Sequence, residues 1–328
     1  NNFYKMMRQK KALVTGAGGF IGHHLVKYLK NRGYWVRGVD IKRPEFEKTS
    51  ADEFLLLDLR KRENADMSSK KMVHVYNLAS NMGGVGFIDT VRAELMRDNI
   101  LIDVNMIDSA YKNGAKRFFY PSSALVYPNF EHSKKNTGLK EEYAYPANPE
   151  SEYGWEKLFA ERLCVNYYSD YGFETRVARF HNVYGPLGVY DGGREKSPAA
   201  ICRKIVLAEE NGEIEVWGDG RQVRSYCYID DCIEGVYRLM QSDVRESINI
   251  GSDYAVSINE LIDIVSKIAK KKIKKKYNTS KPQGVRERNS DNTQIRKLLK
   301  WEPTTTLEEG LAKTYNWIKK DIEKGKNL

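Results

Sequence analysis

Short apolar runs alternate with longer amphipathic stretches along the first half of the chain. The runs that predict buried strands lie at residues 11–15, 34–40, 54–59, 73–79 and 117–127. Helical periodicity follows the first run to about residue 31 and returns at 97–112 and 152–168. Strands joined through helices form right-handed crossovers and therefore a parallel sheet. The pattern predicts an α/β fold with a doubly wound parallel sheet and helices on both faces.

The first strand is followed by a glycine-rich turn, Gly-Ala-Gly-Gly-Phe-Ile-Gly, at residues 16–22. Glycines 16, 19 and 22 allow a tight turn, close approach of the backbone to a pyrophosphate, and close packing of helix on strand. The second strand ends in Asp40, where such folds bind a ribose hydroxyl. This carboxylate would repel a 2′-phosphate, so we favour NAD over NADP although Lys42 and Arg43 follow closely. The spacing predicts a Rossmann-type NAD-binding domain.

Polar or small residues also end the third and fourth predicted strands. Ligands of doubly wound sheets bind at the carboxyl ends of the strands, so Asp58, Asn77 and Ala79 would face the cofactor. An ordinary strand-end turn is the alternative for each of them. The predicted cofactor contacts are Gly16, Gly19, Phe20, Ile21, Gly22, Asp40, Asp58, Leu59, Asn77, Ala79, Tyr153 and Lys157.

Tyr153 and Lys157 lie four residues apart near the start of the 152–168 helix. Side chains at this spacing share one helix face, so the lysine ammonium can lie beside the phenol. A neighbouring cation lowers the pKa of a phenol, which makes tyrosine a usable proton acceptor. The motif alone is weak, because a solvated helix face has the same pattern. A strand-end Ser123 and the glycine-rich turn precede it in the order that a dehydrogenase site needs.

Charge, hydropathy and cysteine spacing argue against a polyanion-binding, a membrane-spanning, a secreted or a metal-binding protein. The formal charge is +10, but seven lysines between residues 267 and 276 carry most of the excess, so a solvated helix end is favoured over a polyanion site. No run is long enough to span a bilayer, and residues 1–10 are polar and basic, unlike a secretory leader. The four cysteines have neither metal-ligand nor disulfide-framework spacing, so we expect no metal and a cytoplasmic protein.

Five further stretches carry a resemblance to a known family. They lie at residues 81–88, 179–186, 192–200, 217–225 and 284–292, and include Asn-Met-Gly-Gly-Val-Gly-Phe-Ile and Gly-Gly-Arg-Glu-Lys-Ser-Pro-Ala-Ala. The chain resembles the extended short-chain dehydrogenase/reductases of the nucleotide-sugar epimerase and dehydratase group. Within that group it is most similar to the GDP-mannose 3,5-epimerases, from residue 13 to about residue 319.

The resemblance implies an NAD-dependent isomerase in which Ser123, Tyr153, Lys157 and Lys196 are catalytic. Tyr153 would take the proton of the sugar C4 hydroxyl, and the resulting 4-ketone would acidify the hydrogens on C3 and C5. Inversion at such a carbon needs a base on one face and an acid on the other. In the family these groups are the lysine matched by Lys196 and a cysteine where this chain has Leu125. A second departure is Asn81, where plant-type enzymes have aspartate.

Leu125 leaves alternatives open. A C4-only epimerase or a 4-dehydrogenase needs only Ser123, Tyr153, Lys157 and NAD. A 4,6-dehydratase is disfavoured because relatives of that kind place an acidic pair where this chain has Ala124 and Leu125. A non-catalytic NAD-binding protein is disfavoured because the Ser, Tyr and Lys set is complete.

The resemblance also implies how the chain is divided and assembled. Residues 8–182 would form the NAD-binding domain, and residues 183–328 mainly a smaller substrate lobe, with about 229–255 returning to the first domain. The helices beginning at Arg97 and Glu152 would pair across a two-fold axis as a homodimer. Neither nucleic acid nor membrane is an expected partner. The residues expected to bind a GDP-sugar are Gly83, Gly84, Asn182, Lys196, Lys204, Gln222, Arg224 and Arg288.

Overall fold

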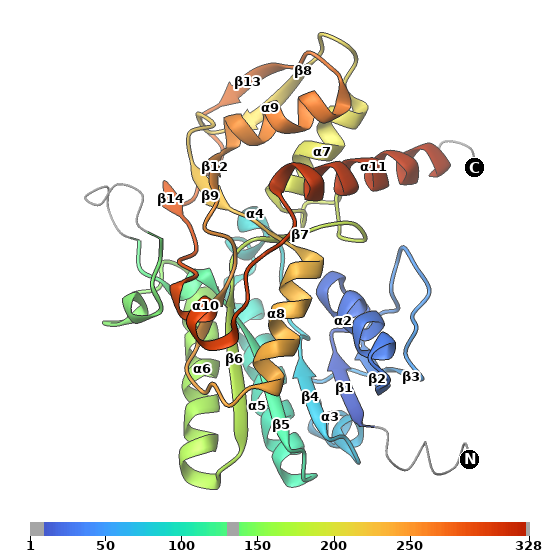
Figure 1. The fold of residues 1–328 in the computed structure, drawn as a ribbon, viewed down its shortest axis with the longest axis vertical. Coiled ribbons are helices and arrows are strands. Elements are labelled where there is room, and N and C mark those ends of the chain that lie inside the picture. Colours follow the sequence, from blue (N-terminus) through green and yellow to red (C-terminus); the bar gives the residue numbers. More distant parts are fainter. Residues whose placement is uncertain (1–9, 130–137, 326–328) are drawn as a thin grey trace.

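The structure is a computed structural model that describes residues 10–129 and 138–325. A parallel sheet with flanking helices forms the larger part, and a smaller part lies beyond the carboxyl ends of its strands (Figure 1). The interpretation of residues 1–10 falls almost entirely outside the described residues. Among the described residues, no helix combines the length and apolar character needed to cross a membrane.

The large sheet contains seven parallel strands in the order β11-β6-β5-β4-β1-β2-β3. The order reverses between β1 and β4, and ligands of open α/β sheets bind at this point. The predicted fold class is therefore confirmed. The strands are β1 (Lys11–Thr15), β2 (Trp35–Asp40), β3 (Glu53–Leu56), β4 (His74–Asn77), β5 (Arg117–Ser123), β6 (Glu174–Phe180) and β11 (Ile248–Ile250).

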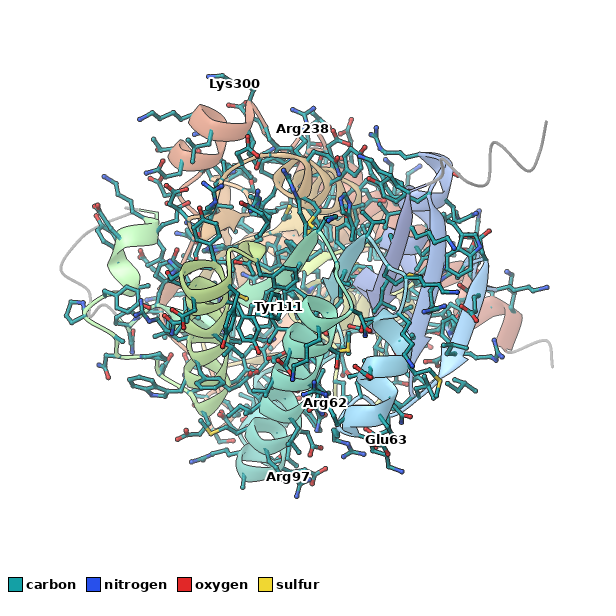
Figure 2. All side chains as sticks on the ribbon, turned by 90° about the horizontal axis from the view of Figure 1, so that it is seen from below. Arg62, Glu63, Arg97, Tyr111, Arg238 and Lys300 are labelled. Carbon is teal, nitrogen blue, oxygen red and sulfur yellow. The ribbon has the colours of Figure 1, made fainter. Side chains whose placement is uncertain are left out.

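Alternating residues of the strands face two helical layers. Leu13 packs with α3 (Arg62–Ser69), α5 (Arg92–Lys112) and α6 (Glu152–Tyr171). Val14 faces the other layer, made of α2 (Phe20–Asn31) and α8 (Ile229–Gln241). Figure 2 shows the first layer, with Arg62 and Glu63 on α3 and with Arg97 and Tyr111 on α5. Because side chains of a strand point alternately to opposite faces, burial on both faces explains why these strands read as continuous apolar runs.

The smaller part combines short strands with three helices. The helices are α7 (Ser197–Leu207), α9 (Ile258–Ala269) and α11 (Leu307–Gly325). Strand β8 (Glu213–Trp217) pairs with β13 (Lys274–Asn278), β9 (Val223–Ser225) lies between β12 (Ala255–Ser257) and β14 (Glu287–Arg288), and β7 (Val183–Tyr184) pairs with β10 (Cys227–Tyr228). The remaining elements are α4 (Val85–Ile88), η1 (Ala124–Val126), η2 (Glu141–Ala144) and α10 (Thr293–Leu299).

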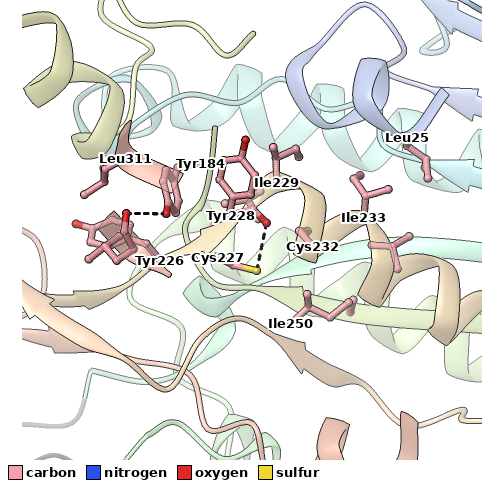
Figure 3. Packing of buried hydrophobic residues seen from close by; sticks show 14 of the residues in the cluster. Leu25, Tyr184, Tyr226, Cys227, Tyr228, Ile229, Cys232, Ile233, Ile250 and Leu311 are labelled. Atoms are coloured by element: carbon pink, nitrogen blue, oxygen red, sulfur yellow. Dashed lines mark hydrogen bonds between the residues drawn. The ribbon is translucent and has the colours of Figure 1, made fainter. Parts of the chain in front are cut away.

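One apolar core runs from the large sheet into the smaller part. Leu25 of α2, Ile233 of α8 and Ile250 of β11 belong to the same buried cluster as Tyr184 of β7 and Leu311 of α11 (Figure 3). Since α8 packs on the large sheet and β11 is one of its strands, the chain crosses into the smaller part and returns. The expected domain boundary near residue 182 remains a prediction.

Several predicted element ends were wrong. The strand expected to continue to residue 127 ends at Ser123, and a 3-10 turn follows. The helix expected from residue 97 begins at Arg92, and the helix expected to end at residue 168 continues to Tyr171, where Gly172 in the left-handed conformation terminates it.

The lysine-rich run has structural partners. The Lys271 Nζ donates to the carbonyls of Ile205, Val206 and Ala208 and so caps the C-terminal end of α7. Lys275 pairs with Asp263 at 2.6 Å, and Lys276 pairs with Glu213 at 3.5 Å. These contacts support the interpretation of the run as a solvated and structural surface.

Candidate active site

The glycine-rich turn joins β1 to α2 and leaves the first turn of α2 open. Gly16 has φ +67°, and a Cβ there would come within 2.6 Å of the Leu78 carbonyl oxygen. A Cβ on Gly22 would overlap the carbonyl of Gly16. No side chain caps the helix at Gly19, so the N–H groups of the first helical turn are free for an anion. The turn therefore has the shape and polarity that a bound pyrophosphate requires.

Asp40 lies beside this turn. Its carboxylate accepts hydrogen bonds from the backbone N–H groups of Gly18 at 2.9 Å and Lys42 at 3.2 Å. Burial raises the pKa of Asp40, although these backbone hydrogen bonds favour the charged form. A pocket between the turn, residues 42–47 and the loop at Leu187 and Val189 opens next to it. A carboxylate at the end of β2 next to an uncapped glycine turn fits the ribose and pyrophosphate of NAD.

The other predicted cofactor residues occupy the same edge of the sheet. Asn77 is buried, accepts from Thr15 Oγ1 at 2.8 Å, and donates to Asp103 at 2.9 Å. The Ala79 N–H donates to the same Thr15 hydroxyl. The Arg60 guanidinium pairs with the Asp58 carboxylate at 2.9 Å, and this hydrogen bond lowers the pKa of Asp58. Contact of these side chains with NAD remains a prediction.

Ser123 immediately precedes η1, which packs against α6, the helix that carries Tyr153 and Lys157. Ser151 caps α6 by accepting from the Gly154 N–H, which places Tyr153 in the first turn and Lys157 one turn further. The Lys157 Nζ lies 5.3 Å from the centre of the Tyr153 ring. Ser123 Oγ accepts from the Leu125 N–H at 3.2 Å, and Leu125 packs in one apolar cluster with Tyr153.

The net pKa of Tyr153 depends on burial as well as on Lys157. Burial raises it above its ordinary value, and the Lys157 ammonium only partly offsets that effect, because Glu156 and Asp103 act in the opposite direction. Burial lowers the pKa of Lys157, but Tyr153, Glu156 and Asp103 together hold it above its usual range. Tyr153 is only 4% exposed. Lys157 therefore acts on the phenol in the expected direction, but burial outweighs its effect.

Sequence reasoning missed the polar residues behind this pair. Glu156, Asp103 and Asn99 are buried on the faces where α5 and α6 meet. Their spacing along α5 could have indicated them, because Asn99 and Asp103 occupy the buried face of the helix, where apolar side chains are expected.

Two of the resemblance stretches meet at the other side of Tyr153. The Gly84 N–H donates to the Arg194 carbonyl at 3.2 Å, and a Cβ on Gly84 would come within 2.8 Å of the Glu195 carbonyl oxygen. The Arg194 guanidinium lies 3.9 Å from the centre of the Phe87 ring. Gly84 thus permits close approach of the 81–88 and 192–196 segments, and the Cβ of any other residue would separate them.

Lys196 is the last residue of the 192–196 segment and the N-cap residue of α7. It is half-buried, and burial lowers the pKa of its ammonium. Within residues 10–129 and 138–325 it has no hydrogen-bond or ion-pair partner for its Nζ. A lysine of this kind is suited to accept or donate a proton near neutral pH.

Apolar groups cover the hydroxyl of Tyr153. The Met82 sulfur lies 3.6 Å from the Tyr153 hydroxyl oxygen. Met82 and Leu125 pack with Ile88, Leu95 and Tyr153 in one cluster. Leu125 therefore belongs to an apolar wall of the site.

Two arginines of the smaller part, Arg288, which is buried, and Arg224, which is partly buried, lie near each other. Arg224 donates to the carbonyls of Val223 and Val285, both at 2.7 Å. It also lies close enough to Arg288 to lower the pKa of that guanidinium. Arg288 is 7% exposed, and burial together with Arg224 lowers its pKa to about 10. Its one carboxylate neighbour in the described part of the chain is Glu150, at 3.4 Å. Two adjacent guanidinium groups with one weak counter-charge are suited to bind a diphosphate.

The other predicted substrate residues are held by backbone groups. Asn182, at φ +46°, donates to the Ser225 carbonyl at 3.0 Å. Gln222 donates to the Trp217 carbonyl at 3.0 Å, and its Oε1 has no partner in the described structure. Lys204 donates to the Glu215 carbonyl at 2.8 Å, so its ammonium is committed to β8. These positions are compatible with substrate contact, which remains a prediction.

Comparison with known proteins adds independent information. The model of the NAD dependent epimerase/dehydratase family matches residues 12–251. The chain is 48% identical over 315 residues to GDP-mannose 3,5-epimerase 1 of Oryza sativa subsp. indica, which covers 95% of this chain and 82% of the rice protein. It is 49% identical over 319 residues to GDP-mannose 3,5-epimerase of Arabidopsis thaliana, covering 96% and 84% of the two chains.

Solved structures agree with the sequence relatives. UDP-glucose 4-epimerase of Thermotoga maritima with UDP-glucose superposes with a TM-score of 0.86 at 28% identity and covers 95% of this chain and 99% of that chain. UDP-glucuronic acid 4-epimerase of Bacillus cereus, in complex with UDP-glucuronic acid and NAD, gives a TM-score of 0.81 at 27% identity, with 94% and 99% covered. Both similarities extend over the large sheet and the smaller part.

Proposed function

Since the chain belongs to the NAD dependent epimerase/dehydratase family, we propose that it is a nucleotide-sugar epimerase acting on GDP-mannose or a closely related GDP-sugar through a transient 4-keto sugar. The observation that carries the proposal is the junction of the 81–88 and 192–196 segments beside Tyr153. The junction brings the backbone that leads to Lys196 against the segment whose Met82 contacts Tyr153, which supports the assignment of both residues to one site. The names and the 48–49% identity of the rice and Arabidopsis relatives support GDP-mannose as substrate.

The residues divide the chemistry between them. NAD, when bound at the glycine turn, supplies a hydride acceptor for the sugar C4 and a donor for its return. Tyr153 takes the proton of the C4 hydroxyl, and Ser123 donates a hydrogen bond to the same oxygen. Lys157 favours the phenolate and opposes the effect of burial.

Lys196 acts on the sugar once C4 is a ketone. The ketone acidifies the hydrogens on C3 and C5, and an amine without an ionic partner can remove one of them. Its lowered pKa enlarges the fraction of free amine near neutral pH. Lys196 is therefore the group to which we assign proton exchange at these carbons.

Arg224 and Arg288 hold the diphosphate. Both guanidinium groups are largely buried, and their mutual repulsion falls when two phosphate charges bind between them. Gly83 and Gly84 carry the loop over the sugar, and Asn182 and Gln222 border the nucleotide.

A second candidate function is a C4-only epimerase or a 4-dehydrogenase of a GDP-sugar. The observation that favours it is the packing of Leu125 with Met82 against Tyr153, because neither side chain carries an exchangeable proton. Inversion at C3 or C5 would then lack the second acid/base group.

A conversion assay tests the substrate class. Purified protein with NAD would be incubated separately with GDP-mannose and UDP-glucose, and the nucleotide sugars would be separated by chromatography. Conversion of GDP-mannose with unchanged UDP-glucose is the expected result. Conversion of UDP-glucose alone would overturn the assignment of the nucleotide.

We further propose a cytoplasmic homodimer formed through α5 and α6. These helices leave Leu101, Val104, Trp155, Phe159 and Val165 exposed, an apolar surface that a second copy of the chain would cover. The four buried free thiols suit a reducing compartment. Light scattering should give the mass of a dimer for the native protein, and Phe159→Glu should shift it toward a monomer. A monomeric native protein would contradict this assembly.

A further inference from the structure

Two carboxylates lie close to Lys157, which is the one ammonium near them in the described part of the chain. Glu156 is fully buried, and Asp103 is 4% exposed. Burial raises the pKa of both carboxyl groups. Burying a second carboxylate beside a single ammonium costs free energy.

The two carboxylates differ in their hydrogen bonds. Asp103 is satisfied at both oxygens, by Asn77 at 2.9 Å and by the Tyr120 hydroxyl at 3.1 Å. Glu156 Oε1 accepts from Asn99 at 3.0 Å and lies 3.9 Å from the Lys157 ammonium. Glu156 Oε2 has no partner within the described part of the chain. Buried side-chain oxygens are usually paired, so this arrangement points to a role beyond packing.

Asn99 connects Glu156 to the loop over the sugar. Its side chain accepts from the Asn81 N–H at 2.7 Å and donates to the Asn81 carbonyl at 3.1 Å. Residue 82 of the same loop contacts the Tyr153 hydroxyl. A buried chain of hydrogen bonds thus runs from the residue beside Lys157 to the segment that covers Tyr153.

We propose that Glu156 is a positioning residue: held by Asn99, it fixes the ammonium of Lys157 beside Tyr153 and sets the pH range in which Tyr153 accepts a proton. This inference rests on the proposed function, in which Tyr153 is the base for the C4 hydroxyl. The ionisable groups that face Lys157 and Tyr153 are Glu156 itself from α6, Asp103 from α5 and Tyr120 from β5.

The negative charge of Glu156 determines the direction in which it shifts the pKa of Tyr153. A negative Glu156 disfavours the phenolate of Tyr153. Removing that charge should lower the pKa of Tyr153, so the base becomes available at lower pH. Asp103 acts in the same direction but with a smaller effect on Tyr153.

The test compares Glu156→Gln with Asp103→Asn and with Glu152→Gln. Glutamine at 156 keeps an oxygen that can accept from Asn99 and removes the charge. Glu152 is an exposed carboxylate one turn earlier on α6 and serves as the matched control. The acidic limb of kcat/KM against pH should move to lower pH by about one unit in Glu156→Gln, by less in Asp103→Asn, and not at all in Glu152→Gln.

A second readout does not depend on turnover. Protein labelled with ¹³C at the tyrosine Cζ would be titrated by NMR with NAD present, and the Tyr153 signal would be assigned from its loss in Tyr153→Phe. Its titration should begin at lower pH in Glu156→Gln than in the native protein. This shift without any activity on GDP-sugars would mean that the proposed function fails and the role of Glu156 stands. Coincident titrations of the two proteins, or a shift in Asp103→Asn alone, would overturn the role of Glu156.

Discussion

Tyr153 and Lys196, the two residues to which we assign proton transfer, are held in contrasting ways. Tyr153 lies on a capped helix, is 4% exposed, and is surrounded by Lys157, Glu156 and Asp103. Lys196 lies at the end of a loop, is half-buried, and has no ionic partner in the described structure. The proposed chemistry at C4 thus depends on a helix and on buried charged groups. The proposed chemistry at C3 and C5 depends instead on the contact of the 81–88 and 192–196 segments.

The largest effect should come from removing the fixed base. Tyr153→Phe keeps the ring and its packing but removes the hydroxyl that accepts the C4 proton, so kcat should fall about 10³-fold. Steady-state assays with GDP-mannose would measure the loss, and a thermal unfolding scan would show that the fold is kept. A variant with near-native kcat would show that Tyr153 is not the base.

The second-largest effect should distinguish the role of Lys196 at C3 and C5 from that of Tyr153 at C4. Lys196→Met removes the loop amine, so deuterium incorporation at C3 and C5 should fall about 10²-fold. Hydride exchange at C4, followed with deuterium-labelled sugar, should change much less, because Tyr153 and Lys157 are untouched. Lys297→Met, at an exposed position on α10, is the control. Equal loss at C4 and at C3 and C5 would contradict the separation.

The pH dependence should also differ between the regions. Burial lowers the pKa of Lys196, so the free amine increases with pH through a value below the ordinary 10.5. Exchange at C3 and C5 should therefore rise several-fold between pH 6 and 9 in the native protein, which ¹H NMR at a series of pH values would measure. A pH-independent exchange rate over this range would argue against a lysine base.

The smallest effect should come from restoring a titratable group to the apolar wall. Leu125→Cys places a thiol beside Tyr153 and Met82, and should raise deuterium exchange at C3 or C5 about tenfold relative to the native protein. Leu125→Met keeps the wall apolar and serves as the control. An equal rise in both variants would attribute the change to space and not to the thiol.

Much of the fold and part of the site could be predicted from the sequence, because their signals are local. The glycine turn, Asp40 and the Tyr153 and Lys157 pair follow from spacing along single elements. The net pKa of Tyr153 could not be predicted, since it depends on burial and on Asp103 from another helix. The contact of Gly84 with residues 194 and 195 joins segments more than 100 residues apart, which only the tertiary structure brings together.

Proton NMR of the native protein with GDP-mannose and NAD in D2O tests the central claim most directly. Deuterium at C3 or C5 is the result that the account predicts, because Lys196 and the 4-ketone suffice for exchange, and a new configuration at the exchanged carbon would mean that a group other than residue 125 supplies the second acid or base. An altered C4 centre or a 4-keto sugar with no deuterium at C3 and C5 would contradict it. That result would show that Leu125 confines the enzyme to chemistry at C4.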